Sequence, residues 1–491
     1  MSSRILIVGV RFTLHAGVAA ALAGCSADTP TSTVDPNVRP SFASSGRTDK
    51  VAICHHTGSG VDYLDVAQRA LAGHLGHGDY VTTLRVSHDF SETGDGVHFA
   101  RIGDALGAAR AGRLARGELT AAACRITITV SAGVYRGTAI GPASGEVEHF
   151  PFIVDVPAIT LRGALVMGVD AAGRATGVGT TDDETTLRSI EPLPTINGAP
   201  TPIVVANSHP GGSAGSGLTV EGFVFQSGAQ PALAPAGLGV LSVRATGLTI
   251  RGNRFESFGS AVDLRASSGD VVQNQAEGTG ACDLCLVGPG TYRAIGNRVL
   301  EGGIEGIITG PVVVLPLPSG VEPYDLPATS ETWAEIRNNE VRDHRRLPAG
   351  AAIRVDAQGL GAPNVHAAVH AAIQDNRLVN NRFGIIVHAG FPAAGTDLKG
   401  DVDVTLSGNA IEQSCQAKLL VALSRHGTAL GLANGPYLRN STFSLSLAGD
   451  VSWNDVWFSH PAGFGNTLTV DGQAIPNGNR QFYSATECPG N

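Results

Sequence analysis

The chain has few aromatic residues and almost no lysine. Aromatic side chains make up 5% of the 491 residues, and only Lys50, Lys399 and Lys418 among the 34 basic residues are lysine. Val, Ile, Leu and Ala must then form the core, and the 64 glycines indicate frequent turns between thin layers. Because the net charge is −9 and no basic block occurs, nucleic acid is not an expected partner.

Long apolar runs are also missing, so the sequence predicts no transmembrane helix. At the N-terminus, Arg4 and Arg11 flank short apolar runs, and the apolar segment 18–24 ends at Cys25. A basic start followed by an apolar stretch is typical of an export signal. We therefore expect residues 1–24 to be a signal peptide and the protein to be exported.

The four residues Leu22-Ala23-Gly24-Cys25 resemble the lipobox of bacterial lipoproteins. The resemblance implies cleavage before Cys25, acylation of Cys25 and anchoring at a membrane surface. Ser26 resembles the outer-membrane sorting signal of that family. An ordinary secretory signal with a coincidental cysteine is the alternative.

Two short regions precede the main body of the chain. Residues 25–50 are rich in Ser, Thr, Pro and Asp, which predicts a disordered tether. Residues 51–90 are predicted to form a small Cys- and His-rich module, which resembles a Cys-His-x-Thr-Gly segment of exported bacterial proteins.

The module contains side chains that Zn²⁺ accepts in a tetrahedral site. The predicted ligands are Cys54, His56, His74 and His77. The alternatives are a disulfide through Cys54 and histidines that serve only as hydrogen-bonding groups in turns. If Cys25 is lipidated, six cysteines remain, and the sequence does not choose among their fifteen pairings. Strand alternation predicts that Cys282 and Cys285 face opposite ways, with separate partners.

A short sequence motif that contains asparagine recurs along the main body of the chain. The asparagines are Asn253, Asn274, Asn297, Asn339, Asn376 and Asn409, at intervals of 21, 23, 42, 37 and 33 residues. Such a period indicates a solenoid, in which each coil covers its neighbour. We expect each asparagine to occupy a left-handed corner and to bond to the next asparagine in a ladder.

These repeats resemble those of the pectin-lyase-like superfamily, whose fold is a right-handed parallel β-helix. The resemblance extends to a capping helix near residues 97–106 and a strand at 125–130 that runs into Gly133-Val134-Tyr135. We therefore predict an all-β protein with the β-helix at 94–450 and a C-terminal cap at 451–491. A single chain of this kind is expected to be a monomer.

Aligning the coils by their asparagines places a set of polar side chains on one outward face. The set is Asp263, Arg265, Asp283, Glu305, Arg354, Asp356 and His388. The resemblance implies that carboxylates hold Ca²⁺ against a sugar acid while an arginine abstracts a proton; two apposed carboxylates would instead suit glycoside hydrolysis. The alternative is a solvated strand face without chemistry.

Two hypotheses about function follow. In the first, an exported, lipid-anchored β-helix binds polysaccharide or another surface component along its long face. In the second, the same scaffold is a lyase or hydrolase of acidic glycans. We prefer the first hypothesis because the sequence contains none of the longer catalytic motifs of the polygalacturonase or pectate-lyase families.

Overall fold

The computed structural model describes a defined part of the chain. The described residues are 50–90, 95–139, 147–178, 184–190, 193, 195–196, 199–207, 216–228, 237–311, 329–345, 350–357, 366–388, 399–423, 438–460 and 462–480. Gly46–Asn491 forms one compact unit. The predicted signal peptide and Cys25 lie outside the described residues, as does most of the predicted tether.

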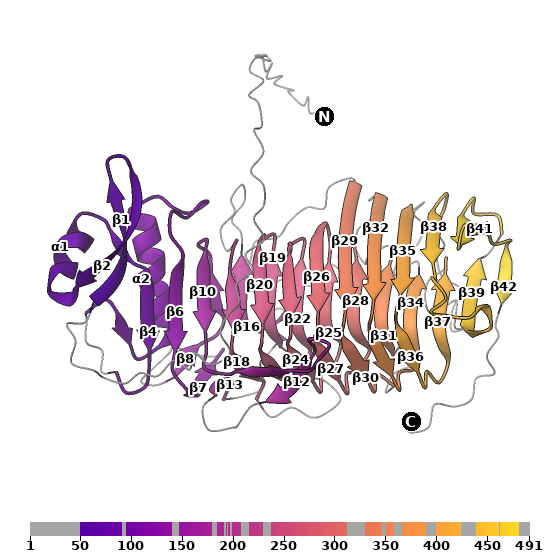
Figure 1. Ribbon diagram of the computed structural model, residues 1–491, viewed down its shortest axis with the longest axis horizontal. Helices are drawn as coiled ribbons and strands as arrows, with labels where there is room; N and C mark the ends of the chain where they lie inside the picture. Colours follow the sequence, from indigo (N-terminus) through magenta and orange to yellow (C-terminus); the bar gives the residue numbers. More distant parts are fainter. Residues whose placement is uncertain are drawn as a thin grey trace, which may run out of the picture. The chain divides into compact units, whose positions relative to one another are not determined.

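Three long sheets, joined by tight corners, wind into a parallel β-helix (Figure 1). Within the described residues, sheet I has fourteen strands, sheet II ten and sheet III eleven. The chain passes through the sheets in the order I, II, III, so each strand pairs with the equivalent strand of the next coil. The predicted all-β, right-handed parallel β-helix is confirmed.

The strands of each sheet follow in chain order. Sheet I contains β4 (Thr83–Val86), β5 (His98–Phe99), β6 (Ile126–Val130), β10 (Ile159–Arg162), β17 (Thr219–Glu221), β20 (Leu248–Arg251), β23 (Gly269–Val272), β26 (Gly290–Ile295), β29 (Thr329–Arg337), β32 (His366–Gln374), β35 (Gly400–Ser407), β38 (Thr442–Ser446), β40 (Thr467–Val470) and β41 (Gln473–Ala474). Sheet II contains β7 (Gly133–Thr138), β8 (Glu148–His149), β13 (Thr185–Ser189), β18 (Phe223–Gln226), β21 (Arg254–Glu256), β24 (Gln275–Glu277), β27 (Arg298–Leu300), β30 (Glu340–Arg342), β33 (Arg377–Val379) and β36 (Ala410–Glu412). Sheet III contains β9 (Phe152–Val154), β16 (Pro202–Asn207), β19 (Leu238–Val243), β22 (Ser260–Arg265), β25 (Cys282–Val287), β28 (Glu305–Gly310), β31 (Ala351–Asp356), β34 (Phe383–His388), β37 (Ala417–Ala422), β39 (Val456–His460) and β42 (Gly478–Arg480).

The corner between sheets I and II holds the six predicted asparagines in one buried ladder. Nδ2 of Asn274 donates to Oδ1 of Asn297 at 3.0 Å and to the backbone oxygen of Ile250 at 2.8 Å. The same pattern repeats along the ladder, and Asn409 ends it by donating to Asp450 at 2.8 Å. Each amide thus supplies hydrogen-bonding partners that a buried turn would otherwise lack.

The predicted left-handed conformation of these asparagines is wrong by one position. Positive φ falls on the residue before each asparagine: Gly252 (61°), Gln273 (53°), Gly296 (66°), Asn338 (56°), Asp375 (55°) and Gly408 (70°). The left-handed residue makes the turn, and the asparagine after it can then point its amide into the interior.

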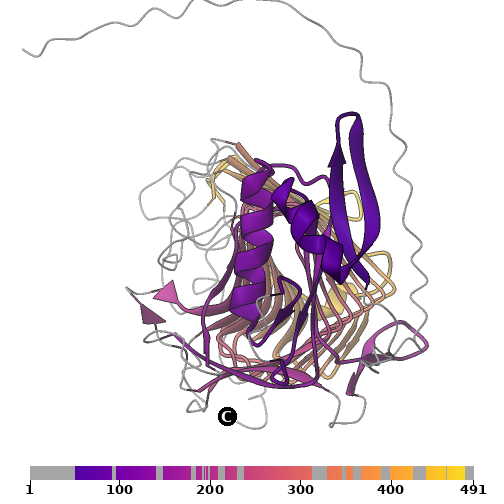
Figure 2. The same cartoon turned by 90° about the vertical axis from the view of Figure 1, so that its left-hand side faces the viewer.

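A helix covers the N-terminal end of the coils (Figure 2). Helix α2 (Ile102–Ala115) buries Ile102, Ala105, Leu106 and Ala109, while Phe99 lies in β5 and not in the predicted helix. Glu148 accepts from the backbone N–H of Ile102 at 2.5 Å and so binds the positive end of the helix dipole. Burial nevertheless raises the pKa of Glu148 to about 7.

The ends of the coiled region differ from the predicted limits. Strand β4 of sheet I already lies inside the predicted 51–90 module, whose other elements are β1 (Lys50–Thr57), β2 (Gly60–Ala67), a 3-10 turn (Gln68–Ala70), α1 (Leu71–Gly76) and β3 (Tyr80–Val81). At the other end, parallel pairing continues through β39 and β40, beyond the predicted limit at residue 450. A 3-10 turn at Trp453–Asp455 precedes β39, and antiparallel β41 and β42 close the sheets.

The described residues of segment 167–217, which lies between β10 and β17, form two short hairpins and two strands of a further coil, β13 and β16. One hairpin pairs β11 (Met167–Val169) with β12 (Ala175–Val178), and the other pairs β14 (Thr195–Ile196) with β15 (Ala199–Pro200). The N–H of Ala175 donates to Gly296 O at 2.8 Å, and Arg298 donates to Thr176 O at 3.1 Å. The first hairpin therefore lies against the asparagine corner, away from the polar residues of sheet III.

Among the described residues, the helices are too short and insufficiently apolar to cross a membrane.

Candidate functional site

Sheet III carries six of the seven polar residues on its outward face, but the predicted position of Asp283 is wrong. Where strands β25 and β28 of sheet III pair, the second residue of each strand has no partner in the register. Cys282 pairs with Glu305, and Leu284 pairs with Ile307. Two consecutive residues then face the interior. Asp283 lies inside with 0% exposure, accepts from Thr279 at 2.7 Å and contacts Nε2 of His344 at 2.8 Å.

The same break in alternation corrects the prediction for Cys282 and Cys285. Both sulfurs lie on the outward side, packed with Val287 and Ile308, and they form a disulfide. A strictly alternating strand would have placed residues three apart on opposite faces. The irregularity at Asp283 is what brings the two sulfurs together.

The six outward residues form two separate groups, both buried. Asp263 and Arg265 pair with each other, with Arg265 Nη2 2.6 Å from Asp263 Oδ2. In the register, Cys285 and Ile308 lie between Asp263 and Arg354, so the backbones of Asp263 and Arg354 are about 14 Å apart at the usual strand spacing. The predicted continuous charged face is therefore interrupted by an apolar patch.

The second group is centred on Arg354. Its Nε donates to Asp356 Oδ1 at 2.8 Å and its Nη2 to Asp356 Oδ2 at 3.0 Å, while Nη1 donates to Glu305. Nε2 of His388 lies 3.0 Å from Asp356 Oδ1. All four residues are at most 5% exposed. Strands β28, β31 and β34 thus bring together four of the predicted catalytic residues.

The electrostatics of this group oppose a role for Arg354 as the arginine base that the family resemblance implies. Burial favours the neutral guanidine, but the charges of Asp356 and Glu305 outweigh it and raise the pKa of Arg354. A guanidinium held in this way keeps its proton. Burial raises the pKa of Glu305 and of Asp356, although the positive charge of Arg354 acts in the opposite direction on both carboxyls. One of the two carboxyls can therefore carry a proton, either to serve as a general acid or as part of a buried ion pair with Arg354.

The outward face of sheet I presents a different arrangement, which was not predicted from the sequence. Strands β29, β32 and β35 are longer than their neighbours, and β29 and β32 extend beyond them in Figure 1. Trp333 is 48% exposed and stacks on His370 of the next coil, with ring centroids 3.9 Å apart and an interplanar angle of 13°. A signal existed in the sequence: alternation along Thr329–Arg337 places Trp333 on the polar side of its strand.

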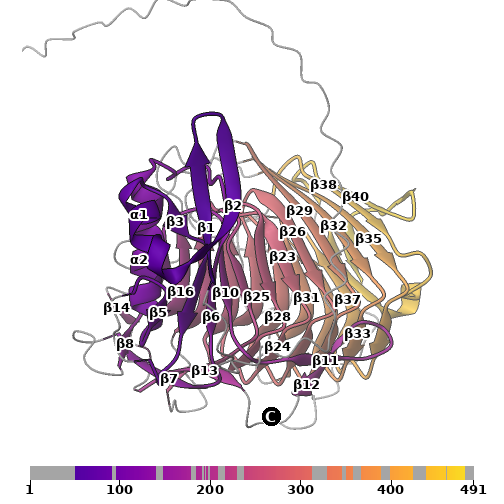
Figure 3. The ribbon, with the colours of Figure 1, turned by 60° about the vertical axis from the view of Figure 1, so that its left-hand side comes forward.

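A groove of about 410 Å³ runs beside this stack. Thr291, Arg293, Glu335 and Asp403 contribute polar groups to its lining. Arg293 Nε donates to Glu335 at 3.1 Å and Nη1 to Asp270 at 3.3 Å, which orients the guanidinium along the sheet. Figure 3 shows the coils of sheet I side by side from β26 to β35. Two partly exposed aromatic rings with hydrogen-bonding groups beside them therefore lie on this face.

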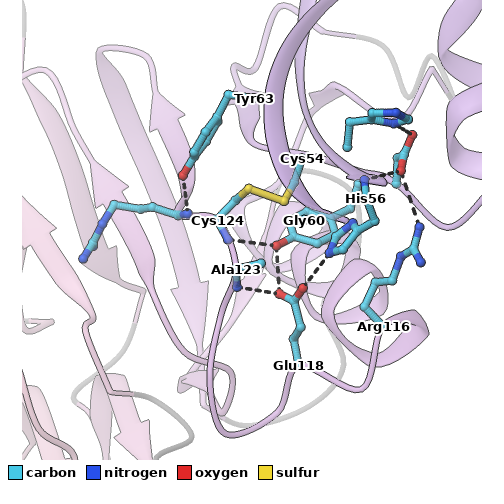
Figure 4. Close-up of a disulfide and its surroundings, with 12 residues drawn as sticks. Cys54, His56, Gly60, Tyr63, Arg116, Glu118, Ala123 and Cys124 are labelled. Carbon is cyan, nitrogen blue, oxygen red and sulfur yellow. Dashed lines mark hydrogen bonds and ion pairs between the residues drawn. A yellow bond between two sulfur atoms is a disulfide. The ribbon is translucent and has the colours of Figure 1, made fainter. Parts of the chain in front are cut away.

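The predicted zinc ligands of the N-terminal module do not come together. Cys54 forms a disulfide with Cys124, so it offers no thiolate (Figure 4). His56 instead bonds to Glu118 at 2.9 Å, and the backbone oxygen of His77 accepts from Arg116 at 2.7 Å. Among the predicted ligands, only His74 belongs to a group of metal-ligating side chains, and its partners there are His55 and Asp79.

Comparisons with known proteins give similarity only at the level of solved structures. No family model and no curated protein matches the chain. An endo-xylogalacturonan hydrolase from Aspergillus tubingensis is 9% identical, with a TM-score of 0.38 over 75% of this chain and 88% of that one. The mannuronan C-5 epimerase A-module of Azotobacter vinelandii is 14% identical, with a TM-score of 0.35 over 79% and 94%. A thermostable α-1,3-glucanase from Streptomyces thermodiastaticus is 15% identical, with a TM-score of 0.35 over 70% and 62%. Because these identities and TM-scores are low, the fold is assigned from the strand pairing of this chain, and the site is assigned from the geometry of its own residues.

Proposed function

We propose that the protein binds a neutral polysaccharide on the outward face of sheet I. The observation that carries the proposal is the exposed stack of Trp333 on His370 beside an open polar groove. The two rings expose an apolar surface that spans two coils, and aromatic surfaces with a few polar groups at their edge are typical of ligand sites.

The chemistry of the face favours a sugar ring. The apolar side of a pyranose stacks on an aromatic ring, while its hydroxyls bond to groups at the edge. Arg293, Glu335 and Asp403 provide charged donors and acceptors there, and Glu331 lies 3.5 Å from His370. Carboxylates outnumber arginines on this face, since Asp270 and Glu335 flank Arg293 while Glu331 and Asp403 lie beside His370. This excess of negative charge disfavours a uronate, so a neutral glycan is the better partner.

Affinity electrophoresis of the full chain through gels containing α-1,3-glucan, cellulose derivatives, polygalacturonate or alginate tests this proposal. We expect retardation by at least one neutral glycan, and loss of that retardation in Trp333→Ala and in His370→Ala, which both remove the stack. The matched control is His366→Ala, on the same strand as His370 and also beside a carboxylate, at 2.9 Å, but outside the groove. Equal retardation of wild type and Trp333→Ala by every glycan would rule the site out.

We also propose that the protein is exported and anchored through acylated Cys25, as the lipobox resemblance implies. A repeat protein with a flat binding face would then present that face at a membrane surface, where it can hold a cell-surface or extracellular glycan. Labelling cells with an alkyne palmitate analogue tests the anchor: wild type should incorporate it and Cys25→Ala should not. Incorporation that persists in Cys25→Ala contradicts it.

A second candidate function is cleavage of a glycan at the group around Arg354. The observation that favours it is the pair of carboxyls with raised pKa that share this one arginine. Reducing-end and ultraviolet assays on the same glycans, compared between wild type and Glu305→Gln, distinguish this function from binding alone. New chain ends that Glu305→Gln fails to produce support cleavage, and no new ends from wild type exclude it for those glycans.

A further inference from the structure

The N-terminal module contains a convergent group that none of the functions above uses. His55 comes from β1, His74 from α1, and Asp79 from the turn before β3. Nδ1 of His55 lies 2.8 Å from Asp79 Oδ2, and Nδ1 of His74 lies 2.9 Å from the same oxygen. Two imidazole nitrogens from separate elements therefore meet at one carboxylate oxygen.

The carboxylate of Asp79 is fixed from its other side. Oδ1 accepts from the backbone N–H of His56 at 3.0 Å and lies 3.4 Å from Nη2 of Arg116. The Asp79 side chain is 0% exposed, whereas those of His55 and His74 are 31% and 27% exposed. The shared oxygen thus faces the two rings, and one side of the group is open to solvent.

We propose that this group binds Zn²⁺ through Nδ1 of His55, Nδ1 of His74 and Oδ2 of Asp79. Each imidazole then carries its proton on Nε2, and water completes the tetrahedron. Two nitrogens and one carboxylate oxygen are a ligand set that zinc accepts when one position stays open. The three residues each offer a ligand atom within 4.8 Å of the others.

The distances suit the ion. Tetrahedral bonds of about 2.0–2.1 Å place neighbouring ligand atoms about 3.3 Å apart. The nitrogen–oxygen separations of 2.8 and 2.9 Å need to widen by only a few tenths of an ångström. The partly exposed rings on β1 and α1 can move by that amount without disturbing the core, and they leave an entry path for the ion.

Zinc titration of the full chain, after chelator treatment and dialysis, tests the site by isothermal calorimetry and by metal content. We expect one Zn²⁺ per chain, and at least about a 100-fold loss of affinity in His74→Ala and in Asp79→Asn. His77→Ala and His88→Ala are the matched controls, since neither residue belongs to the group, and both should bind as wild type does. Circular dichroism of each zinc-free variant verifies the fold.

Electronic absorption of Co²⁺ gives a second readout that does not depend on stability. Tetrahedral cobalt in the wild type should give intense visible bands, which His55→Ala should weaken. The proposal is overturned if wild type binds no stoichiometric zinc, or if His55→Ala, His74→Ala and Asp79→Asn all bind as tightly as wild type. Loss of binding in His77→Ala, with unchanged binding in His55→Ala and Asp79→Asn, would also overturn the proposal, since His77 lies outside the group.

Discussion

Sheets I and III are built from the same coils, yet their outward faces have opposite properties. On sheet I, Trp333 is 48% exposed and Arg293 lies at the surface among exposed carboxylates. On sheet III, Arg354 is 3% exposed and His388 is 0% exposed. Polar side chains at coil spacing therefore form an open platform on one face and closed ion pairs on the other.

The difference shows that strand register alone does not identify a functional face. Both faces stack side chains at about 4.8 Å per coil, so both could follow an extended ligand. Exposure decides what the charges do: surface pairs are weakened by water, whereas buried pairs depend on each other. Four experiments separate the two faces.

The largest effect is expected for Arg354→Ala. Removing the guanidinium leaves Glu305 and Asp356 buried without their shared cation, which should lower the free energy of unfolding by about 3–5 kcal/mol. Guanidinium denaturation followed by circular dichroism measures the change. A loss below about 1 kcal/mol would show that the group is solvated and that the two faces do not differ.

Trp333→Ala, on sheet I, should reduce glycan affinity and leave the stability of the fold almost unchanged. Affinity for the bound glycan should fall at least tenfold, or about 1.4 kcal/mol, because the stacking surface is removed. The free energy of unfolding should stay within about 0.5 kcal/mol, as for other exposed substitutions. If stability falls instead while affinity is kept, the indole serves packing and not recognition.

The pH dependence of stability sharpens the comparison through Glu305. Burial raises its folded pKa above the ordinary value of 4.5, so its favourable contribution is present below pH 4.5 and is lost as pH rises through the folded pKa. Glu305→Gln mimics the protonated group and does not titrate. As pH rises from about 4 to about 7, the variant should therefore gain stability relative to wild type, with a slope of at most about 1.4 kcal/mol per pH unit. Denaturation at a series of pH values measures this, and parallel stability curves for the two proteins contradict the raised pKa.

The smallest effect is expected for Arg293→Ala. This side chain is 45% exposed and bridges Asp270 and Glu335 at the surface of sheet I. The loss in unfolding free energy should be below about 1 kcal/mol and should shrink further at high salt. Denaturation at two salt concentrations measures it, and a loss as large as that of Arg354→Ala would erase the distinction between the faces.

Part of the site could be predicted because the asparagine repeat sets the coil register. That register placed Glu305, Arg354, Asp356 and His388 on one face, and strict alternation then failed at Asp283 and at Cys282 and Cys285. In most coils of sheet III, the residue without a partner in the register is small, as at Gly306 and Ala352. A small residue does not show in the hydrophobic pattern that the strand departs from strict alternation. The convergence of His55 and His74 on Asp79 was not predicted for another reason: Asp79 lies 24 residues from His55 in the sequence, and the Cys/His spacing favoured a different set of ligands.

The β-helix could be predicted from the amino-acid sequence, since a repeated corner and alternating apolar residues admit few other ways to bury one face of every coil. The asparagine spacing also placed six of the seven polar residues on the outward face of sheet III, with Asp283 as the exception. The folded protein alone shows which columns are exposed, which cysteines form disulfides and which histidines converge on Asp79. Those outcomes depend on contacts between residues of different coils and elements, and short-range periodicity carries no information about them.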